Sequence, residues 1–309
     1  NQTFQDFEFI IIDDGSTDNS LRILSSYKDP KIRLITNETN MGLSRSLNKG
    51  IDLCRGEYIA RMDDDDISLP GRLKEQTSFM NKYPQIGVCG SRATQINHEG
   101  YIVRGTTQHK LIDKSIKVQL IFGTCFAHSS VMFQSSLLRK HKIKYDETFY
   151  ASQDYYLWWL LSKKTHFGNI KHPLIKYRIH SNMISRENKH KQDEYADLTR
   201  RIVLSDILGK SISDRELLMH RKLIDGESSG NREQLIEMMD WIRDIIQCNN
   251  KEEIYNKRAL RQALSNYWYW HVNNSKQKIS GAQGFYFGIK DFRRLNHNAI
   301  KTLVKSYYD

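Results

Sequence analysis

Four consecutive aspartates, Asp63 to Asp66, directly follow a predicted strand over residues 57–62. Adjacent carboxylates repel one another, so a folded chain must place a cation or water beside them. In an extended segment the side chains at i and i+2 share a face, so Asp63 and Asp65 can point into one pocket. Such a pair could hold Mg²⁺ or Mn²⁺ while the phosphates of a substrate complete the coordination. An isolated run of this kind is more often a solvated acidic turn, and its surroundings must decide.

The surrounding elements are typical of a parallel α/β sheet. Apolar runs at residues 7–12, 31–36 and 57–62 alternate with amphipathic helical patterns. Asp13 and Asp14 end the first of these strands, and the acidic run ends the third. Ligands of such sheets bind beyond the carboxyl ends of the strands. We therefore expect both acidic groups to lie in one crevice.

The pattern changes along the chain. An aromatic-rich helix is predicted at residues 153–163 and a strand at residues 174–180, but beyond about residue 186 strand patterns almost vanish. We therefore predict a catalytic α/β domain over residues 1–190 and a helical, basic C-terminal region over residues 191–309.

Composition fits a globular protein, with 39% hydrophobic and 11% aromatic residues among 309. No apolar run approaches the roughly 18–20 residues that span a bilayer, and no signal-peptide pattern is present. The four cysteines are scattered without CxxC spacing, which suits a reducing cytoplasm. The net charge of +11 is partly local, since residues 257–309 contain ten Lys or Arg and two Asp.

Six segments of the sequence stand out, in the order FIIIDDGSTDNS (9–20), NMGLSRSLNKGI (40–51), GEYIARMDDDD (56–66), LPGRL (69–73), SQDYYLW (152–158) and YRIH (177–180). Together they resemble glycosyltransferase family 2, in which such segments occur in the same order. The resemblance covers roughly residues 1–185 and is specific because six fragments keep their order. It implies the nucleotide-sugar-binding GT-A fold, an α/β fold with a mostly parallel central sheet, followed here by the helical C-terminal region.

The resemblance assigns roles to the acidic residues. Asp14 would hydrogen-bond the base of the donor nucleotide. Asp65 would be the metal ligand, for Mn²⁺ or Mg²⁺, and Asp63 would face the ribose or the metal shell. Asp64 fills the variable middle position of the nucleotide-sugar-binding motif, and Asp66 the acidic position that often follows.

Asp154 matches the catalytic base of the family, and Gln153 replaces its usual acidic neighbour. The base would take the proton of the acceptor hydroxyl, and the sugar would be transferred with inversion. Read without the family, Asp154 is an acidic residue at the start of a helix, where its charge is favourable in any case.

Several basic residues are further candidates. We expect Arg178 and Arg72 in the nucleotide-sugar site, although Arg72 could instead anchor the acidic loop. His180 would approach the metal or the diphosphate, or else make a structural hydrogen bond. His128 could line the acceptor pocket or be a satisfied core histidine. For Arg45 and Lys49, attraction of donor phosphate competes with the commoner role of exposed helix charges.

The implied partners are a nucleotide-sugar donor, UDP-linked by default with GDP or dTDP as alternatives, and a glycan or lipid-linked acceptor. Bacterial surface-polysaccharide assembly is the implied role. No groove-reading element or stacking platform for nucleic acid is apparent. Aromatic and basic residues at 267–271 and 285–287 suit contact with anionic lipid at the inner face of the cell membrane, and equally suit a helical subdomain.

Two other functions remain open, a sugar-nucleotide pyrophosphorylase and a non-catalytic polyanion-binding module. A further expectation concerns the first strand of the family. That strand would precede Asn1 by roughly 20 residues, so we expect the natural protein to be longer, strand edges here to be exposed, and this chain to bind its donor weakly.

Overall fold

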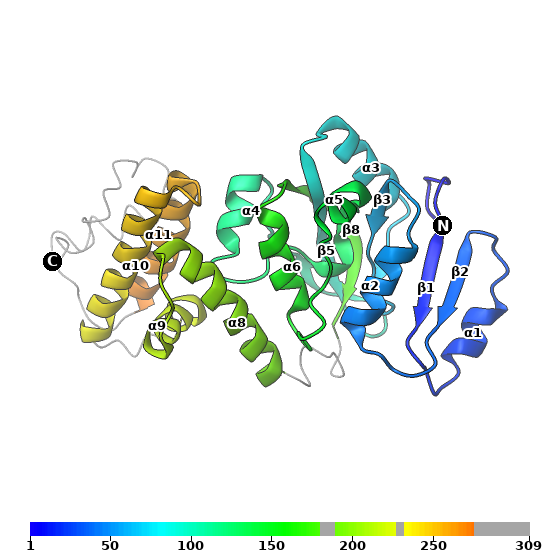
Figure 1. Cartoon of the computed structure of the whole chain (residues 1–309), viewed down its shortest axis with the longest axis horizontal. Helices are drawn as coiled ribbons and strands as arrows, with labels where there is room; N and C mark the ends of the chain where they lie inside the picture. Colours follow the sequence, from blue (N-terminus) through cyan, green and yellow to red (C-terminus); the bar gives the residue numbers. More distant parts are fainter. Residues whose placement is uncertain (180–188, 227–231, 275–309) are drawn as a thin grey trace. The chain divides into compact units, whose positions relative to one another are not determined.

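The structure, a computed structural model, describes residues 1–179, 189–226 and 232–274. The chain divides into two units, residues 1–199 and residues 200–309 (Figure 1). All the strands found in the described residues lie in the first unit, and helix α8 (Lys189–Leu208) crosses the boundary. The α/β class with a helical C-terminal region, predicted from the sequence, is confirmed.

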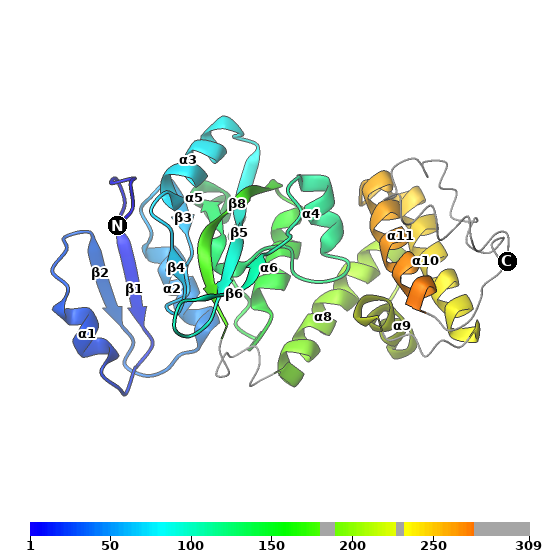
Figure 2. The same ribbon diagram turned by 180° about the vertical axis from the view of Figure 1, so that it is seen from behind.

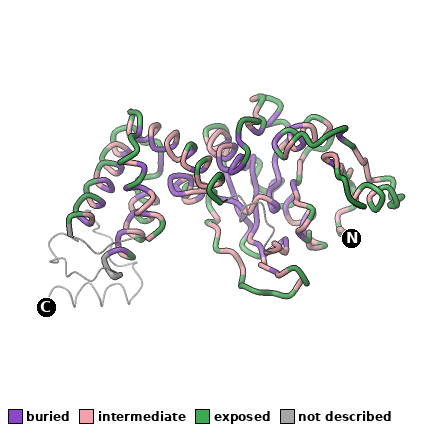
Figure 3. Tube along the Cα trace, turned by 90° about the horizontal axis from the view of Figure 1, so that it is seen from below, coloured by how far each residue is buried: buried purple, intermediate pink, exposed green. Residues whose placement is uncertain are grey.

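The first strands form a small sheet of their own. Strands β1 (Phe9–Asp13) and β2 (Ile32–Thr36) pair in parallel, joined through helix α1 (Ser20–Ser26). Within β1 only Asp13 is fully buried, although apolar runs of this kind usually form strands buried on both faces of a parallel sheet. Helix α1 buries none of its residues. Figure 3 shows this region mostly as exposed and half-buried chain.

A second, six-stranded sheet forms the centre of the unit. Its strands are β3 (Tyr58–Ala60), β7 (Met132–Gln134), β5 (Ile86–Ile96), β8 (His166–Arg178) and β4 (Ile67–Ser68) in spatial order, with β6 (Ile102–Thr106) also paired to β5. Figure 2 shows β4 and β6 from the opposite side. Only β5 and β8 run parallel in this sheet, so it is mixed, where we expected it to be mostly parallel. The difference arises because β6 returns directly from β5 and β7 enters antiparallel between β3 and β5.

Two apolar clusters cover the two faces of this sheet, as the alternation of strand side chains requires. Val88 and Phe133 belong to one cluster, while their neighbours Cys89 and Met132 belong to the other. The first cluster is completed by α2 (Leu43–Leu53), α4 (Asp113–Gln119), α5 (Ser135–His141) and α6 (Gln153–Ser162), and the second by α3 (Arg72–Lys82). The strand ends that carry the acidic residues are thus held between helices.

The second unit is helical in the described residues. It contains α9 (Asp214–Asp225), α10 (Arg232–Glu252) and α11 (Lys257–Asn274). Within α11, Trp268 is buried and Trp270 is 46% exposed, while residues 285–287 lie outside the described part. No helix in the described ranges is long and apolar enough to cross a membrane. Contact with a membrane surface stays a prediction.

Candidate active site

Asp63, the first carboxylate of the acidic run, is already paired within the protein. Both of its oxygens accept hydrogen bonds from the guanidinium of Arg61, and Ser129 Oγ donates to Asp63 Oδ2 at 2.5 Å. The Arg61 side chain is only 6% exposed. Because planar, two-pronged pairs of this kind fix orientation as well as charge, Asp63 is held in place before any ligand arrives.

Asp63, Asp65 and Asp66 form a group that could hold a metal ion, since one ligand atom of each lies within 4.8 Å of the others. Asp66 accepts a hydrogen bond from the Arg178 backbone N–H at 2.8 Å, while its buried Oδ2 has no partner at hydrogen-bonding distance. Burial raises the pKa of Asp66 to about 6, and the charges of Asp65 and Asp63 add to the rise. A group of carboxylate oxygens of this kind suits a hard cation such as Mg²⁺ or Mn²⁺.

Arg72 lies away from the surface where a donor would bind. Its side chain is 1% exposed, and its Nη2 donates to the backbone carbonyls of Arg61 at 2.6 Å and Val131 at 3.3 Å. Its Nε donates to Gln76 Oε1 at 2.9 Å. We therefore correct the expected donor-binding role: Arg72 anchors the chain that leads into the acidic run, which was the alternative from the sequence.

Arg178 also holds the acidic run through backbone carbonyls. Its Nε donates to the carbonyl of Asp65 at 2.8 Å, and its Nη1 donates to those of Asn97 at 2.9 Å and His98 at 2.7 Å. The guanidinium is thus engaged where we expected it to meet phosphate. Arg72 thus binds the backbone just before the acidic run, and Arg178 binds the backbone within it. His180, the other predicted metal contact, lies outside the described residues.

Asp154 stands in the first turn of α6, as predicted. Thr124 Oγ1 donates to its Oδ2 at 3.0 Å, and Trp158 Nε1 donates to Thr124 Oγ1 at 3.2 Å. Burial raises the pKa of Asp154, while the hydrogen bond from Thr124 and the charge of Arg61 oppose the rise. A carboxylate that binds protons more readily than usual is suited to act as a general base near neutral pH.

Tyr177 links the acidic run to Asp154. Burial raises the pKa of its phenol to about 12, and the charges of four carboxylates add to this rise. These carboxylates are Asp66, Asp63, Asp65 and Asp154. The charges of the predicted metal group and of the predicted base, Asp154, thus act on the same phenol.

His128 is a satisfied histidine, the second of the two roles left open by the sequence. Its Nε2 is 2.7 Å from the hydroxyl of Tyr145, and its ring meets Trp158 edge to face. Burial, aided by the charge of Arg61, lowers the pKa of His128 well below its usual value. The imidazole is therefore neutral and supports Tyr145.

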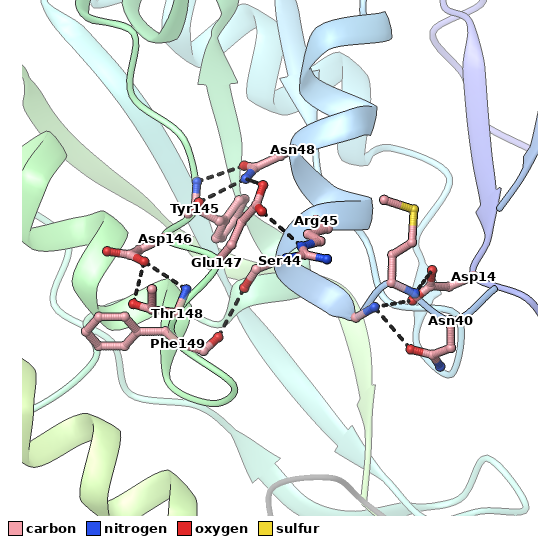
Figure 4. Close-up of polar contacts among 12 residues, drawn as sticks. Asp14, Asn40, Ser44, Arg45, Asn48, Tyr145, Asp146, Glu147, Thr148 and Phe149 are labelled. Atoms are coloured by element: carbon pink, nitrogen blue, oxygen red, sulfur yellow. Dashed lines mark hydrogen bonds and ion pairs between the residues drawn. The ribbon is translucent and has the colours of Figure 1, made fainter. Parts of the chain in front are cut away.

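Asp14 lies in the turn after β1 and holds the start of α2. Its carboxylate accepts from Asn37 Nδ2 at 2.7 Å. It also accepts from the backbone N–H groups of Met41 and Gly42 at 2.9 Å each (Figure 4). These bonds lower the pKa of Asp14 against the opposing effect of burial. Lys49 donates to Asn37 Oδ1 at 2.6 Å, so it supports this turn. That Asp14 shares a crevice with the acidic run stays a prediction.

Sequence reasoning missed Arg61, Ser129, Thr124 and Tyr177 as members of this site. A signal existed for Arg61, a charged residue among the apolar residues of GEYIARM just before the acidic run. Ser129 and Thr124 carry no such signal, because their role depends on loops that meet the acidic run only after folding.

Comparisons with known proteins identify the family of this chain. Residues 1–142 match the family model described as "Glycosyl transferase family 2". An uncharacterized glycosyltransferase of Methanocaldococcus jannaschii is 37% identical over 204 residues, covering 64% of this chain and 70% of the relative. The O-antigen biosynthesis glycosyltransferase WbnJ of Escherichia coli is 33% identical over 191 residues, covering 59% of this chain and 71% of the relative.

Among solved structures, that of S. aureus TarS residues 1–349 in complex with UDP aligns with a TM-score of 0.53 at 14% identity. The alignment covers 99% of this chain and 82% of the TarS chain. At that identity the likeness shows a shared fold. The two sequence relatives are more than 30% identical to this chain over more than two thirds of their own length, which shows a shared family. This chain therefore belongs to glycosyltransferase family 2 and is a transferase.

Proposed function

We propose that this enzyme transfers a sugar, with inversion at the anomeric carbon, from a nucleoside diphosphate sugar to a hydroxyl group of a glycan or lipid-linked acceptor. The observation that carries the proposal is that Asp154 and the metal-sized carboxylate group of the acidic run both act electrostatically on Tyr177. The acceptor class is supported by the E. coli relative, which acts in O-antigen biosynthesis. UDP as donor nucleotide is supported by the TarS structure with UDP.

Asp154 is the proposed base. As the acceptor oxygen forms its bond to the anomeric carbon, the hydroxyl proton passes to the Asp154 carboxylate and the bond from sugar to diphosphate breaks. Attack from the face opposite the leaving group inverts the anomeric centre. General-base assistance of this kind typically contributes about 10²- to 10⁴-fold in rate. Thr124 orients the carboxylate for this step through its hydrogen bond to Oδ2.

Asp65 and Asp66 are the proposed ligands of a divalent cation, Mn²⁺ or Mg²⁺. Such a cation supplies positive charge for the leaving diphosphate. Asp63 borders this site and is kept in position by Arg61 and Ser129. We place Asp64 and Asp14 toward the nucleoside part of the donor, with Asp14 toward the base.

The test is sugar transfer from a panel of nucleotide sugars in the presence of Mn²⁺, with Asp154→Asn as the decisive variant. We expect that variant to bind the donor in calorimetry but to lose transfer by about two orders of magnitude or more. Full transfer by Asp154→Asn would remove the base assignment.

The same panel separates the alternative functions. A pyrophosphorylase would form a nucleoside triphosphate from nucleotide sugar and pyrophosphate, with no acceptor. A polyanion-binding module would bind none of the nucleotide sugars. Either result would replace the transferase proposal.

A further inference from the structure

Helix α2 carries polar side chains on a buried face. Ser44 and Asn48 are 7% and 5% exposed. A buried polar group costs free energy unless it is hydrogen-bonded, so both side chains require partners. The exposed Asp52 follows them at the same spacing of four residues. Their partners all lie in one segment, residues 144–149, which we call the strap.

The strap lies along α2 in the opposite direction (Figure 4). Its contacts with the helix are Lys144 Nζ to Asp52 Oδ2 at 2.6 Å, Asn48 Nδ2 to the Tyr145 carbonyl at 2.9 Å, the Tyr145 N–H to Asn48 Oδ1 at 2.9 Å, and Ser44 Oγ to the Phe149 carbonyl at 3.2 Å. Asn48 thus satisfies both backbone groups of Tyr145 with a single amide, as a neighbouring strand would.

Glu147 adds a second layer of contacts to the same helix. Its Oε1 accepts from Asn48 Nδ2 at 3.2 Å, and its Oε2 accepts from Arg45 Nε at 3.0 Å. Arg45 therefore serves the strap, where the sequence left open a role with donor phosphate. Asn48 is the residue shared by both layers, since it contacts Tyr145 and Glu147 together.

Two strained backbone positions bracket the strap. Lys142 has φ 53° and Ser152 has φ 52°, both in the left-handed region that residues other than glycine rarely adopt. Such positions persist only where surrounding contacts hold them. Ser152 is followed within two residues by Asp154, so the contacts that hold the strap also hold the entry to the proposed base.

Tyr145 connects the strap to the site itself. Its side chain is buried, its hydroxyl contacts His128 Nε2 at 2.7 Å, and the charges of Asp154 and Asp63 act on its phenol. A movement of the Tyr145 backbone would therefore change the surroundings of Asp154.

We propose that Asn48 is a positioning residue for the transfer reaction, which holds Asp154 in its working place through Tyr145 and the strap. The proposal rests on the proposed role of Asp154 as base. Asn48 contacts none of the proposed reacting groups, and its effect passes through the strap, by way of the Tyr145 backbone and the Glu147 side chain. A displacement of about 1 Å at a reacting group can cost about 10²-fold in rate, so a small slackening of the strap is enough.

The test compares Asn48→Ala with the matched control Asp52→Ala. Asp52 lies one turn further along the same helix face, in an exposed pair with Lys144. In folded protein, checked by circular dichroism, we expect Asn48→Ala to lower kcat by about 10- to 100-fold while the donor KM changes by less than about twofold. Asp52→Ala should keep the kcat of the wild type.

The pH profile of kcat separates positioning from loss of fold. A variant that merely unfolds in part loses active enzyme but keeps the profile. With Asn48→Ala, water should reach Asp154 more easily, so the acidic limb should move to lower pH. The other groups that act on Asp154, namely Thr124, the Tyr155 N–H, Arg61 and Trp158, are not replaced in this variant. Cys125, Tyr145 and Tyr177, which interact with the Asp154 charge, are not replaced either.

An unchanged kcat and pH profile in folded Asn48→Ala, with Asp154→Asn inactive, would overturn the inference and leave the proposed function standing. Full activity of Asp154→Asn would overturn both together. If Asn48→Ala does not fold, the double variant Ser44→Ala/Glu147→Ala loosens the same strap from its two sides, and wild-type kcat there would likewise overturn the inference.

Discussion

Arg61 and Asp63, two residues apart on the same segment, form an ion pair in which two guanidinium nitrogens meet both carboxylate oxygens. The arginine side chain is 6% exposed and the aspartate 31%, so the pair lies where the core meets the site. The positive charge of Arg61 also acts on Asp154, where it opposes the rise in pKa that burial causes. The acidic run is therefore partly neutralised by the protein itself.

Replacing Arg61 should change the pH at which the enzyme works. In Arg61→Ala the cation that lowers the pKa of Asp154 is gone, while Thr124 and the buried surroundings remain. The pKa of Asp154 then rises further, so the acidic limb of kcat/KM should move to higher pH. Arg61→Lys keeps the charge but not the two-pronged geometry, so its limb should move less. A limb that stays in place in folded Arg61→Ala would contradict this electrostatic role.

Asp65 should govern metal binding more than its neighbour Asp64. Asp65 belongs to the metal-sized carboxylate group, whereas Asp64 is exposed and lies outside that group. We expect Asp65→Asn to weaken Mn²⁺ binding by about tenfold or more, because one charged oxygen ligand is lost. Titration of Mn²⁺ followed by electron paramagnetic resonance measures this without catalysis. Equal weakening by Asp64→Asn would show that net charge, rather than the group, sets the affinity.

Asp66 should make folding stability depend on pH. Its folded pKa of about 6 lies above the unfolded value of about 3.9, so the folded state binds the proton more tightly. Its contribution is therefore complete below pH 4 and is lost as pH rises through 6, at a cost on the order of 2–3 kcal/mol. In Asp66→Asn that loss disappears, so the variant should be more stable than wild type at pH 7 and similar at pH 4. Urea unfolding with a chelator present measures the unfolding free energy of both proteins at each pH. The same dependence of this free energy on pH in wild type and Asp66→Asn would contradict the assignment.

Arg72 offers a test of anchoring against donor binding. Arg72→Met fills similar space but leaves the carbonyls of Arg61 and Val131 without this donor, which should cost about 1–3 kcal/mol of unfolding free energy. The donor KM of the folded enzyme should stay near that of wild type. The exposed Lys74 on the same helix provides the control Lys74→Met, with little expected change. A large rise in donor KM without loss of stability would restore the donor-binding role.

The sequence could predict where the carboxylates lie because their positions are local facts. Asp63 and Asp65 follow a strand and Asp154 begins a helix, and each of these features depends on neighbouring residues alone. The direction of the strands could not be predicted in this way. Strand β7 lies between β3 and β5 although residues 61–85 separate those two in the chain, and such long-range pairing leaves no periodic signal.

The hydrogen-bond partners of the charged and polar side chains could not be predicted from the sequence either. Arginine is rarely buried, so Arg72 was expected at a ligand, but Gln76 and two carbonyls satisfy it inside the protein. The polar residues of α2 were overlooked for a related reason. Leu47 and Ile51 of that helix indicate an apolar core face, and only the folded strap explains why Asn48 is buried beside them.

The two-stranded sheet has a consequence for the order in which parts of the enzyme open. In the described residues β1 pairs only with β2, and α1 contributes no buried side chain, so little free energy opposes local opening there. The amide hydrogens of β1 and β2 should exchange with solvent well before those of β5 and β8. Asp14 is thus attached to a weakly protected part of the unit, whereas Asp154 stands on α6, whose side chains belong to the first apolar cluster. A bound nucleotide should therefore be detected first as slowed exchange around Asp14.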